Sequence, residues 1–428
     1  MIMVFSQFKK NNTLVGSCTV FPEKISMQTV QELFPIRNYD REKLLAFTTD
    51  LKSEVFPKES VLFRYDDKID SCLYLLKGTI TLTNEIGQSI EIAAGTNQAK
   101  FPLSTGAIHR HTAIAATDVS VLRVSKRILS PKYAPQTELS KLNIPDEFME
   151  NRLMSLFAHH YSSEELQIPL LPDIAMRVRR ALKNDAGIHD IVKIVQFDPV
   201  ISARLIGMAN CPLYVSSIPT RTCLDAVTRI GLNATCNLVT SLSITRIFKN
   251  DSPAIKKYIE AIWERSLYIS ILSYFLAKAT KQVNPQEAQL AGLISEIGAV
   301  PFLGFIANLP PECYAKSDID KILPYIKGAI GYKVLNDWGF SEEFLKVPVY
   351  SENWYQDTSE ELNLTDIVVL SKLHSKIGQQ NTIEEFPPFT SIPAAGKLKE
   401  LSLTPELSLS ILSGAKQQIN EMTKILYC

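Results

Sequence analysis

Two different periodicities divide this chain. From about Val55 to Val124, apolar and polar residues alternate, as in LYLLKGTITLT and SIEIAAG, and short turn segments such as YDDKID separate the runs. A two-residue period is typical of half-buried strands. From about Glu164 onward, apolar residues recur at i, i+3, i+4 and i+7, which is the period of an amphipathic helix. We therefore expect a β-rich region of short strands followed by a helical region.

Composition sets limits on partners and compartment. The 428 residues are 46% hydrophobic, which is enough for two or three domains with sizeable cores. Lys+Arg and Asp+Glu number 45 each, so the net charge gives no reason to expect nucleic acid or an anionic membrane as partner. The seven cysteines form no Cys-x-x-Cys pair, which favours reduced thiols in a cytoplasmic protein. The longest apolar windows fall short of the roughly 18 residues that span a bilayer.

The helical region contains clear start and stop signals. Asp198 precedes a proline, as an N-cap acid precedes the first helical residue. Thr222 and Asp225 have the spacing of a capping box, and Gly231 can end a helix. These signals predict several short helices joined by tight turns.

The β-rich region resembles cyclic nucleotide-binding domains. The segment FPKESVLFRYDDKIDSCLYLLKGTITL has the family's order of strands and turns, with Gly78 and Gly95 at its glycine turns. Arg110 and Thr112 fall where the family places an arginine for the cyclic phosphate and a small hydroxyl residue. The resemblance implies a jelly-roll β-barrel over residues 30–131, with a ligand site near Arg110, Thr112 and Phe101.

This region also departs from the family pattern. Lys100-Phe101 replaces the Gly-Glu pair that approaches the ribose, and Glu59 replaces an early glycine. Arg110 is then either a surface or ion-paired arginine, or part of a pocket for some anionic ligand. His109 and His111 flank it on an expected strand, where alternation places both on the opposite face. Without a third ligand, two exposed histidines are expected rather than a metal site.

The helical region resembles the HDOD domain, a relative of the HD metal phosphohydrolases. The match preserves residue order and spacing over about 80 residues and continues more weakly to about Tyr350. It implies an all-α, HD-like helical bundle over residues 164–365 and structural roles, in caps and turns, for the signature residues. The matching residues are Pro172, Asp198, Pro199, Arg204, Leu205, Ala209, Asn210, Tyr214, Ile218, Ala226, Gly231 and Leu232.

The resemblance also locates the positions of the HD metal ligands, and no histidine stands at any of them. The first is Arg265, two residues after Trp263, and the His-Asp pair reads Ser295-Glu296. The later positions are Lys327 and the pair Ser351-Glu352. Positive side chains repel cations, and one carboxylate is not a metal site. We therefore expect no metal, no cofactor and no catalysis.

These observations predict a multidomain β + α chain. Besides the two domains, we expect an N-terminal segment at 1–29, a linker at 132–163 and a C-terminal extension at 366–428 with a final helix. The function implied by the two resemblances is that of a bacterial, non-catalytic signal-transduction protein. Its HDOD domain would be the output or protein-interaction scaffold, coupled to a degenerate sensor-like barrel. Other signalling proteins are the expected partners, and a nucleotide second messenger is a further candidate.

Two alternatives remain open. One is a metal-dependent phosphohydrolase with an atypical site built around Glu296, Asp318, Asp320 and Asp337. The other is a true receptor for a cyclic nucleotide or cyclic di-GMP. A helix-turn-helix reading of LDAVTRIGLNATCNLV is disfavoured because its second helix has almost no Lys or Arg.

Overall fold

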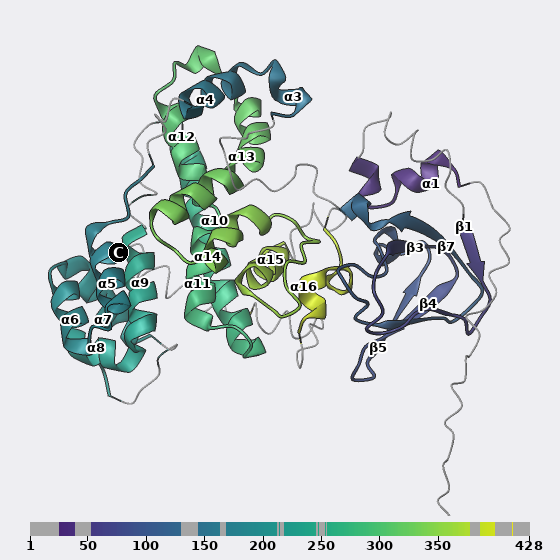
Figure 1. The fold of residues 1–428 in the computed structure, drawn as a ribbon, viewed down its shortest axis with the longest axis horizontal. Helices are drawn as coiled ribbons and strands as arrows, with labels where there is room; N and C mark the ends of the chain where they lie inside the picture. The colour runs from purple at the N-terminus through teal and green to yellow at the C-terminus, as the bar shows by residue number, and fades with distance from the viewer. Residues whose placement is uncertain are drawn as a thin grey trace, which may run out of the picture. The chain divides into compact units, whose positions relative to one another are not determined.

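The computed structural model describes residues 25–38, 53–129, 144–162, 168–211, 214, 218–244, 247, 253, 255–376, 386–398 and 413. The chain forms two compact units (Figure 1). The β unit comprises Met1–Ser130 and Pro387–Gly396, and the helical unit comprises Pro131–Phe386 and Lys397–Cys428. The helix expected between Glu406 and Tyr427 lies outside the described residues, apart from Ser413.

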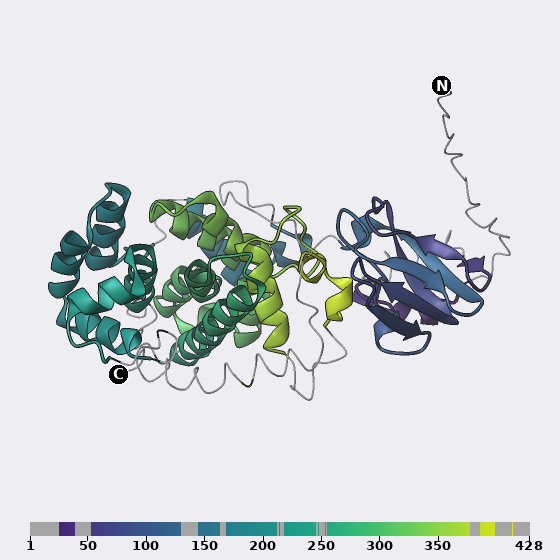
Figure 2. The same cartoon turned by 90° about the horizontal axis from the view of Figure 1, so that it is seen from below.

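The β unit is built from two antiparallel sheets (Figure 2). One has the strand order β1-β7-β3 and the other β2-β6-β4-β5. Apolar side chains from both sheets form one core cluster, which explains the alternating pattern along the strands. The expected β-rich region is therefore confirmed. The strands are β1 (Ser53–Phe56), β2 (Val61–Phe63), β3 (Ser71–Lys77), β4 (Thr79–Thr83), β5 (Ser89–Ala93), β6 (Thr112–Ala115) and β7 (Val119–Ser125).

Two turns of the β unit have backbones in the left-handed region. Gly78 has φ +86°, and a Cβ there would lie 2.3 Å from the carbonyl oxygen of Asp118. Glu59 has φ 69°, although it carries a side chain. The backbone thus keeps a conformation suited to glycine at the position where Glu59 stands in place of the family's glycine, and Glu59 is strained there.

Residues 25–38 complete the β unit. They contain α1 (Met27–Gln31) and the 3-10 helix η1 (Ile36–Asn38). The Phe34 ring stacks on Phe101 with centroids 4.8 Å apart, and the Tyr74 hydroxyl donates to the Phe34 carbonyl over 2.7 Å. The boundary expected after residue 29 is therefore wrong, because it cuts through α1, which packs on the same domain. Two further 3-10 helices follow, η2 (Gln98–Lys100) and η3 (Lys126–Leu129).

The helical unit begins with a group of helices that share one core cluster. The cluster forms because the apolar residues of each amphipathic helix face the same interior. These helices are α5 (Asp173–Lys183), α6 (Ile188–Gln196), α7 (Pro199–Ala209), α8 (Cys223–Ile230) and α9 (Leu232–Ile244).

The remaining helices of this unit include two long ones, α10 with 25 residues and α13 with 22. They include α10 (Lys256–Thr280), α11 (Pro285–Ile294), α12 (Ala299–Ala307), α13 (Lys316–Asp337), α14 (Glu342–Tyr350) and α15 (Leu364–His374). All eleven residues of α15 are buried, so α15 is a core helix of the bundle. The boundary expected at residue 365 stays a prediction, and the apolar run LTDIVVLSKLH forms α15 within the helical unit. The 3-10 helix η6 (Pro311–Cys313) joins α12 to α13.

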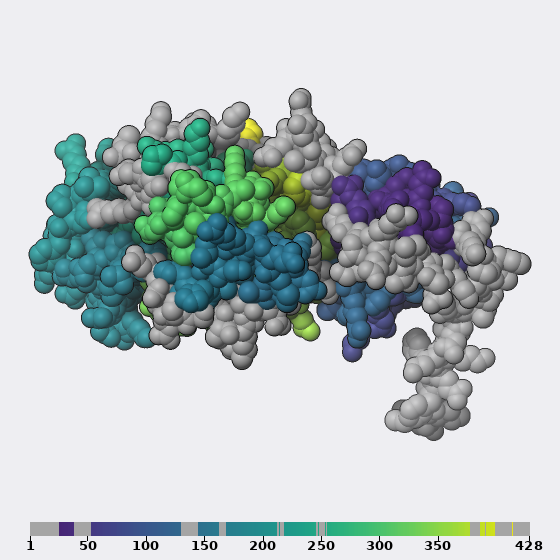
Figure 3. All heavy atoms as spheres, turned by 90° about the horizontal axis from the view of Figure 1, so that it is seen from above, coloured from purple at the N-terminus to yellow at the C-terminus, as the bar shows by residue number. Residues whose placement is uncertain are grey.

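The expected linker at 132–163 is wrong for its second half. α3 (Asp146–Met149) and α4 (Arg152–Ser162) are helices that pack against α12 and α13 (Figure 3). The centroid of the Phe157 ring lies 5.2 Å from that of Phe302 and 5.6 Å from that of Phe305. Phe148 similarly lies 5.5 Å from Tyr325. The apolar face of α4 is short, and the polar sequence AHHYSSEE follows it. The helical period is therefore too brief to predict this helix from the sequence.

One apolar stretch requires a correction. Residues Pro285–Ala307 contain an 18-residue window with mean hydropathy 1.8, which is long and apolar enough to cross a membrane. However, 83% of that window is buried inside the protein, and a turn at residues 295–298 divides it into α11 and α12. Its apolar character therefore reflects packing within the helical unit.

Candidate functional site: a charge network in the helical unit

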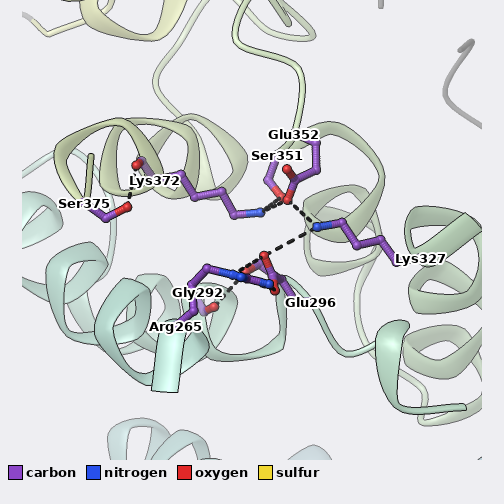
Figure 4. Close-up of polar contacts among 9 residues, drawn as sticks. Arg265, Gly292, Glu296, Lys327, Ser351, Glu352, Lys372 and Ser375 are labelled. Atoms are coloured by element: carbon purple, nitrogen blue, oxygen red, sulfur yellow. Dashed lines mark hydrogen bonds and ion pairs between the residues drawn. The ribbon is translucent and has the colours of Figure 1, made fainter. Parts of the chain in front are cut away.

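The positions expected to correspond to metal ligands come together in the helical unit (Figure 4). Arg265 extends from α10, Glu296 from the turn after α11, and Lys327 from α13. Glu352 follows the C-terminal end of α14. Packing of α10 against α11 and of α13 against α14 brings these side chains to one place. These four side chains therefore lie close together in the structure.

Close packing of the Glu296 turn explains the glycine after it. A Cβ on Gly298 would lie 1.9 Å from the carbonyl oxygen of Lys327. Only a residue without a side chain allows the turn and α13 to approach this closely. The Ser295 hydroxyl donates to the Gly292 carbonyl over 2.9 Å and is buried. Ser295 thus closes the last turn of α11 rather than joining the charged side chains.

Glu296 is the buried carboxylate of the network. Nε of Arg265 lies 3.0 Å from each carboxylate oxygen of Glu296, and Nη2 of Arg265 also donates to Oε2. Nζ of Lys327 is 3.4 Å from Oε1. Only 6% of the Glu296 side chain is exposed, so these contacts replace most of its hydration. Both of its oxygens are thereby engaged by cations of the chain itself.

Glu352 is the second carboxylate, and two ammonium groups share it. Nζ of Lys327 lies 2.9 Å from Glu352 Oε1, and Nζ of Lys372 donates to the same oxygen. Nζ of Lys372 also donates to the Ser351 hydroxyl over 3.0 Å. Lys372 was not among the residues expected at this site. The available signal was a lysine inside the apolar run of α15, because a buried lysine needs a partner.

The pKa values follow from this mutual pairing. Burial would raise the pKa of Glu296 and of Glu352, but the nearby ammonium groups of Lys327 and Lys372 outweigh it and lower both. Burial would lower the pKa of Lys327, but Glu352 and Glu296 raise it overall. For Lys372, burial prevails and its pKa is lowered. The two carboxylates are therefore ionised at neutral pH.

The residues of this network do not suit a metal ion. Three cationic side chains, Arg265, Lys327 and Lys372, contact two carboxylates. An added cation would meet their repulsion and would have to displace ion pairs that already neutralise the carboxylates. Within the described residues, no group of three or more His, Cys, Asp or Glu side chains is arranged to hold a metal.

The alternative four-carboxylate site is wrong. Asp318 and Asp337 lie near opposite ends of α13, nineteen positions apart, which is about 28 Å at 1.5 Å per residue. Asp318 caps that helix through the Ala315 N–H, Asp320 accepts from the Tyr258 hydroxyl, and Asp337 pairs with Lys333. The acidic residues are thus used separately and do not form a site with Glu296.

Most of the signature residues have the structural roles expected for them. The Asp198 carboxylate accepts from the Val200 and Ile201 N–H groups, each over 3.0 Å. Gly231 ends α8 with φ +88°. The Asn210 side chain donates to the Thr220 carbonyl over 2.8 Å and accepts from its N–H over 2.7 Å. Asn210 therefore closes the loop after α7, as proposed from the sequence.

Two other signature residues are less well explained. Nε of Arg204 is buried and has no hydrogen-bond partner among the described residues, and the Tyr214 hydroxyl is buried near the Gln286 side chain. Burial raises the pKa of the Tyr214 phenol.

In the β unit, the expected ligand residues are divided between the core and the surface. Phe101 is only 1% exposed and stacks on Phe34, so its ring fills the core. The Thr112 hydroxyl accepts from the Tyr65 N–H over 3.0 Å at the start of β6. Arg110 is half-buried and close enough to Tyr65 to lower the pKa of that phenol, although Glu85 raises it more strongly.

The placement expected for the neighbouring histidines is wrong. His109 and His111 precede β6 instead of lying on a strand. His109 is buried, and its ring stacks on Phe63 with centroids 3.8 Å apart. Burial lowers the pKa of His109 to about 4 and also lowers that of His111. Both are therefore neutral at pH 7, and His109 is a core residue.

Solved structures of other proteins resemble parts of this chain. A protein from Shewanella amazonensis SB2B, named "Putative metal-dependent phosphohydrolase", has a similar fold, with a TM-score of 0.55 and 23% identity over 64% of this chain and 100% of that chain. The β region has a neighbour in a "Putative Cyclic nucleotide-binding protein" from Geobacter metallireducens GS-15, with 20% identity and a TM-score of 0.21 over 24% of this chain and 79% of that chain.

Sequence comparison gives one relative and one domain. An uncharacterized protein of Treponema pallidum (strain Nichols) is 28% identical over 140 residues, which is 32% of this chain and 26% of that protein. The match thus spans about a quarter of the relative's length. The sequence model of the HDOD domain family matches residues 168–353, which include Arg265, Glu296, Lys327 and Glu352. Four residues of the charge network therefore lie in the HDOD domain of this chain, and Lys372 follows the matched residues in sequence.

Proposed function

We propose that this chain is a non-catalytic regulatory protein of the cytoplasm. Its HDOD domain would act as a protein-interaction scaffold, coupled to a degenerate sensor-like β unit. The observation that carries the proposal is that Arg265, Lys327 and Lys372 pair with the carboxylates at the positions aligned with HD metal ligands. These cations supply internally the positive charge that a metal would bring, but they cannot activate a bound water as a metal does.

The surface of helices α5 to α8 supports a scaffold role. Several large apolar side chains are exposed in this region, and such exposure is often found where proteins bind one another. An open groove of about 870 Å³ is lined by Ile188, His189, Leu224, Asp225, Thr228 and Arg229, from α6 and α8. The exposed apolar residues in this part of the chain are Leu170, Met176, Phe197, Val200, Ile218 and Leu224. Other signalling proteins are the proposed partners.

The test of the non-catalytic role is a hydrolysis assay on the purified full chain. Bis-p-nitrophenyl phosphate and cyclic di-GMP are offered with Mg²⁺, Mn²⁺, Fe²⁺ or Zn²⁺, and metal content is measured on protein purified without chelator. We expect neither turnover nor stoichiometric metal. Turnover that requires a metal and disappears in Glu296→Gln would show that the network is an active site and would refute the proposal.

The scaffold role has a separate test. The tagged chain is used to capture partners from its native cell, with Leu224→Glu in the α6–α8 groove as the variant. The matched control is Ile90→Glu, because Ile90 has similar exposure, 39% against 38%, but lies on β5. We expect partners that Leu224→Glu loses and Ile90→Glu retains. If both variants captured the same partners equally, the α6–α8 groove would not be the binding surface.

A further inference from the structure

Residues 387–396, here called the strap, pack with the β unit although they follow the helical unit in sequence. The strap contains the 3-10 helix η8 (Phe389–Ser391) and the short helix α16 (Pro393–Gly396). Within it, Ser391, Ile392 and Ala394 are each at most 2% exposed. The strap is therefore an ordered part of the β unit.

The strap covers the loop that leads to Arg110. Residues 101–105 of this loop are all buried, and the Thr105 hydroxyl donates to the Ser391 carbonyl. At the other end, Gly396 lies against the stem of Arg110. A Cβ on Gly396 would stand 2.5 Å from Cγ of Arg110 and 3.1 Å from its Cβ. This contact requires glycine at the last position of α16.

Both residues that flank the strap are anchored in the helical unit. Before the strap, the Phe386 ring makes an edge contact with Trp354, with centroids 5.7 Å apart. After it, Nζ of Lys397 lies 2.9 Å from Asp357 and 3.0 Å from Asp366. The Lys397 side chain is only 1% exposed, so its ammonium group depends on these two carboxylates.

The Lys397 anchor and the charge network share a helix. Asp366 belongs to the capping box at the start of α15, where it accepts from the Asn363 N–H. Lys372, further along α15, holds Glu352 of the network. The chain that leaves the strap is therefore fixed to the same rigid helix that supplies a cation to the site in the HDOD domain.

We propose that the strap closes the Arg110 loop of the β unit and ties it, through Lys397 and α15, to the HDOD domain. Release of the strap would open the loop at the position where the sequence resemblance places an anionic ligand. The regulatory meaning of this device rests on the proposed function. Its existence does not, because the strap can be tested without a ligand, a partner or an assay of catalysis.

The test is hydrogen exchange on the full chain with Gly396→Ala. Because the new methyl group collides with the Arg110 stem, we expect exchange in residues 101–110 and 387–396 to accelerate about tenfold. The double variant Arg110→Ala/Gly396→Ala removes Cγ and Cδ and should restore most of the protection. Gly304→Ala is the matched control, since a Cβ there meets nothing within 4 Å.

A second variant tests the tie to the helical unit. Lys397→Met removes the ammonium group between Asp357 and Asp366, and we expect faster exchange in the strap and in residues 101–110. Lys321→Met, at an exposed position of α13, should leave both unchanged. Unchanged loop exchange in Gly396→Ala would overturn the closure. Unchanged loop exchange in Lys397→Met would overturn the tie. The closure would also be overturned if Gly396→Ala exchanged faster throughout the chain and the double variant Arg110→Ala/Gly396→Ala did not restore protection.

Discussion

In the helical unit, the positions that the resemblance aligns with HD metal ligands carry charged side chains that pair with one another, whereas in the β unit the loop near Arg110 is covered by the strap. Arg265, Lys327 and Lys372 supply three positive groups beside Glu296 and Glu352. In the β unit, the Phe101 ring fills the core, and the strap supplies the Ser391 carbonyl, which accepts from Thr105, and Gly396, which lies against Arg110. The first arrangement depends on charge pairing, and the second depends on packing.

The difference follows from the chemistry of the groups in each place. Carboxylates that converge need counter-charges, or they repel one another and take up protons. A loop without charged partners needs mainly surface to cover its apolar and backbone groups. The two units should therefore fail under different perturbations. Separate observation is feasible because all three tryptophans, Trp263, Trp338 and Trp354, belong to the helical unit.

The largest expected effect is the loss of packing in the β unit. Phe101→Ala removes a fully buried ring that stacks on Phe34, and we expect the unit to lose about 3–5 kcal/mol of unfolding free energy. Hydrogen exchange of β3 and β7 measures this loss. Ile90→Ala, on an exposed part of β5, is the control and should cost well under half as much. If tryptophan fluorescence reports the main loss instead, the assignment of Phe101 to the β core is wrong.

Charge removal should be the corresponding weakness of the HDOD domain. Glu296→Gln leaves Lys327 and Arg265 with fewer counter-charges. We expect the unfolding free energy of the helical unit to fall by about 3 kcal/mol. Urea unfolding monitored by tryptophan fluorescence measures this loss. The loss should persist at high salt, because a 6% exposed carboxylate is poorly screened. Glu264→Gln, on the exposed side of α10, should be nearly neutral. Equal effects of the two variants would contradict the network.

A pH change should weaken both units through one buried histidine each. Burial lowers the pKa of His109 and of His374 to about 4. Since the unfolded chain takes up a proton near pH 6.5 and the folded chain does not, stability is full above that pH and declines as the pH falls toward 4. Between pH 7.5 and 5, we expect each histidine to account for a loss of about 2 kcal/mol.

Two variants assign this pH dependence. His374→Gln should remove the dependence from the tryptophan signal of the helical unit and leave exchange in the β unit unchanged. His109→Phe, which keeps the stack on Phe63, should do the reverse. Glu296 and Glu352 have lowered pKa values, so their contribution is lost only as the pH falls below the ordinary range of glutamate, near 4.

The smallest expected effect concerns backbone strain. Glu59→Gly relieves a φ of 69° in the β unit, and we expect a gain of about 0.5–1 kcal/mol in unfolding free energy after the entropic cost of glycine. Lys58→Gly is the control. Because the backbone of Lys58 is not in the left-handed region, this variant should be less stable than the unmodified protein. Hydrogen exchange of β1 and β2 compares the two. A loss in Glu59→Gly would mean that the glutamate side chain stabilises the turn.

Some features of this protein follow from the sequence alone. Alternation predicted the β unit, helical spacing predicted the bundle, and local signals predicted the caps at Asp198 and Thr222 and the helix end at Gly231. Such features depend on neighbours in the sequence, so the pattern contains them. The resemblance to the HDOD domain also pointed to Arg265, Glu296, Lys327 and Glu352, all of which lie within the matched residues 168–353.

Other features depend on residues that are distant in the chain. Lys372 joined the network only through the packing of α15, and α4 was taken for a linker because its apolar face is short. Phe101 was assigned near a ligand, but its stack on Phe34 places it in the core. The strap is the clearest case, since nothing local in PFTSIPAAG indicates that Gly396 meets Arg110. Periodicity and capping are local and readable from sequence, whereas the partner of a buried charge or of a covered loop is decided by tertiary packing.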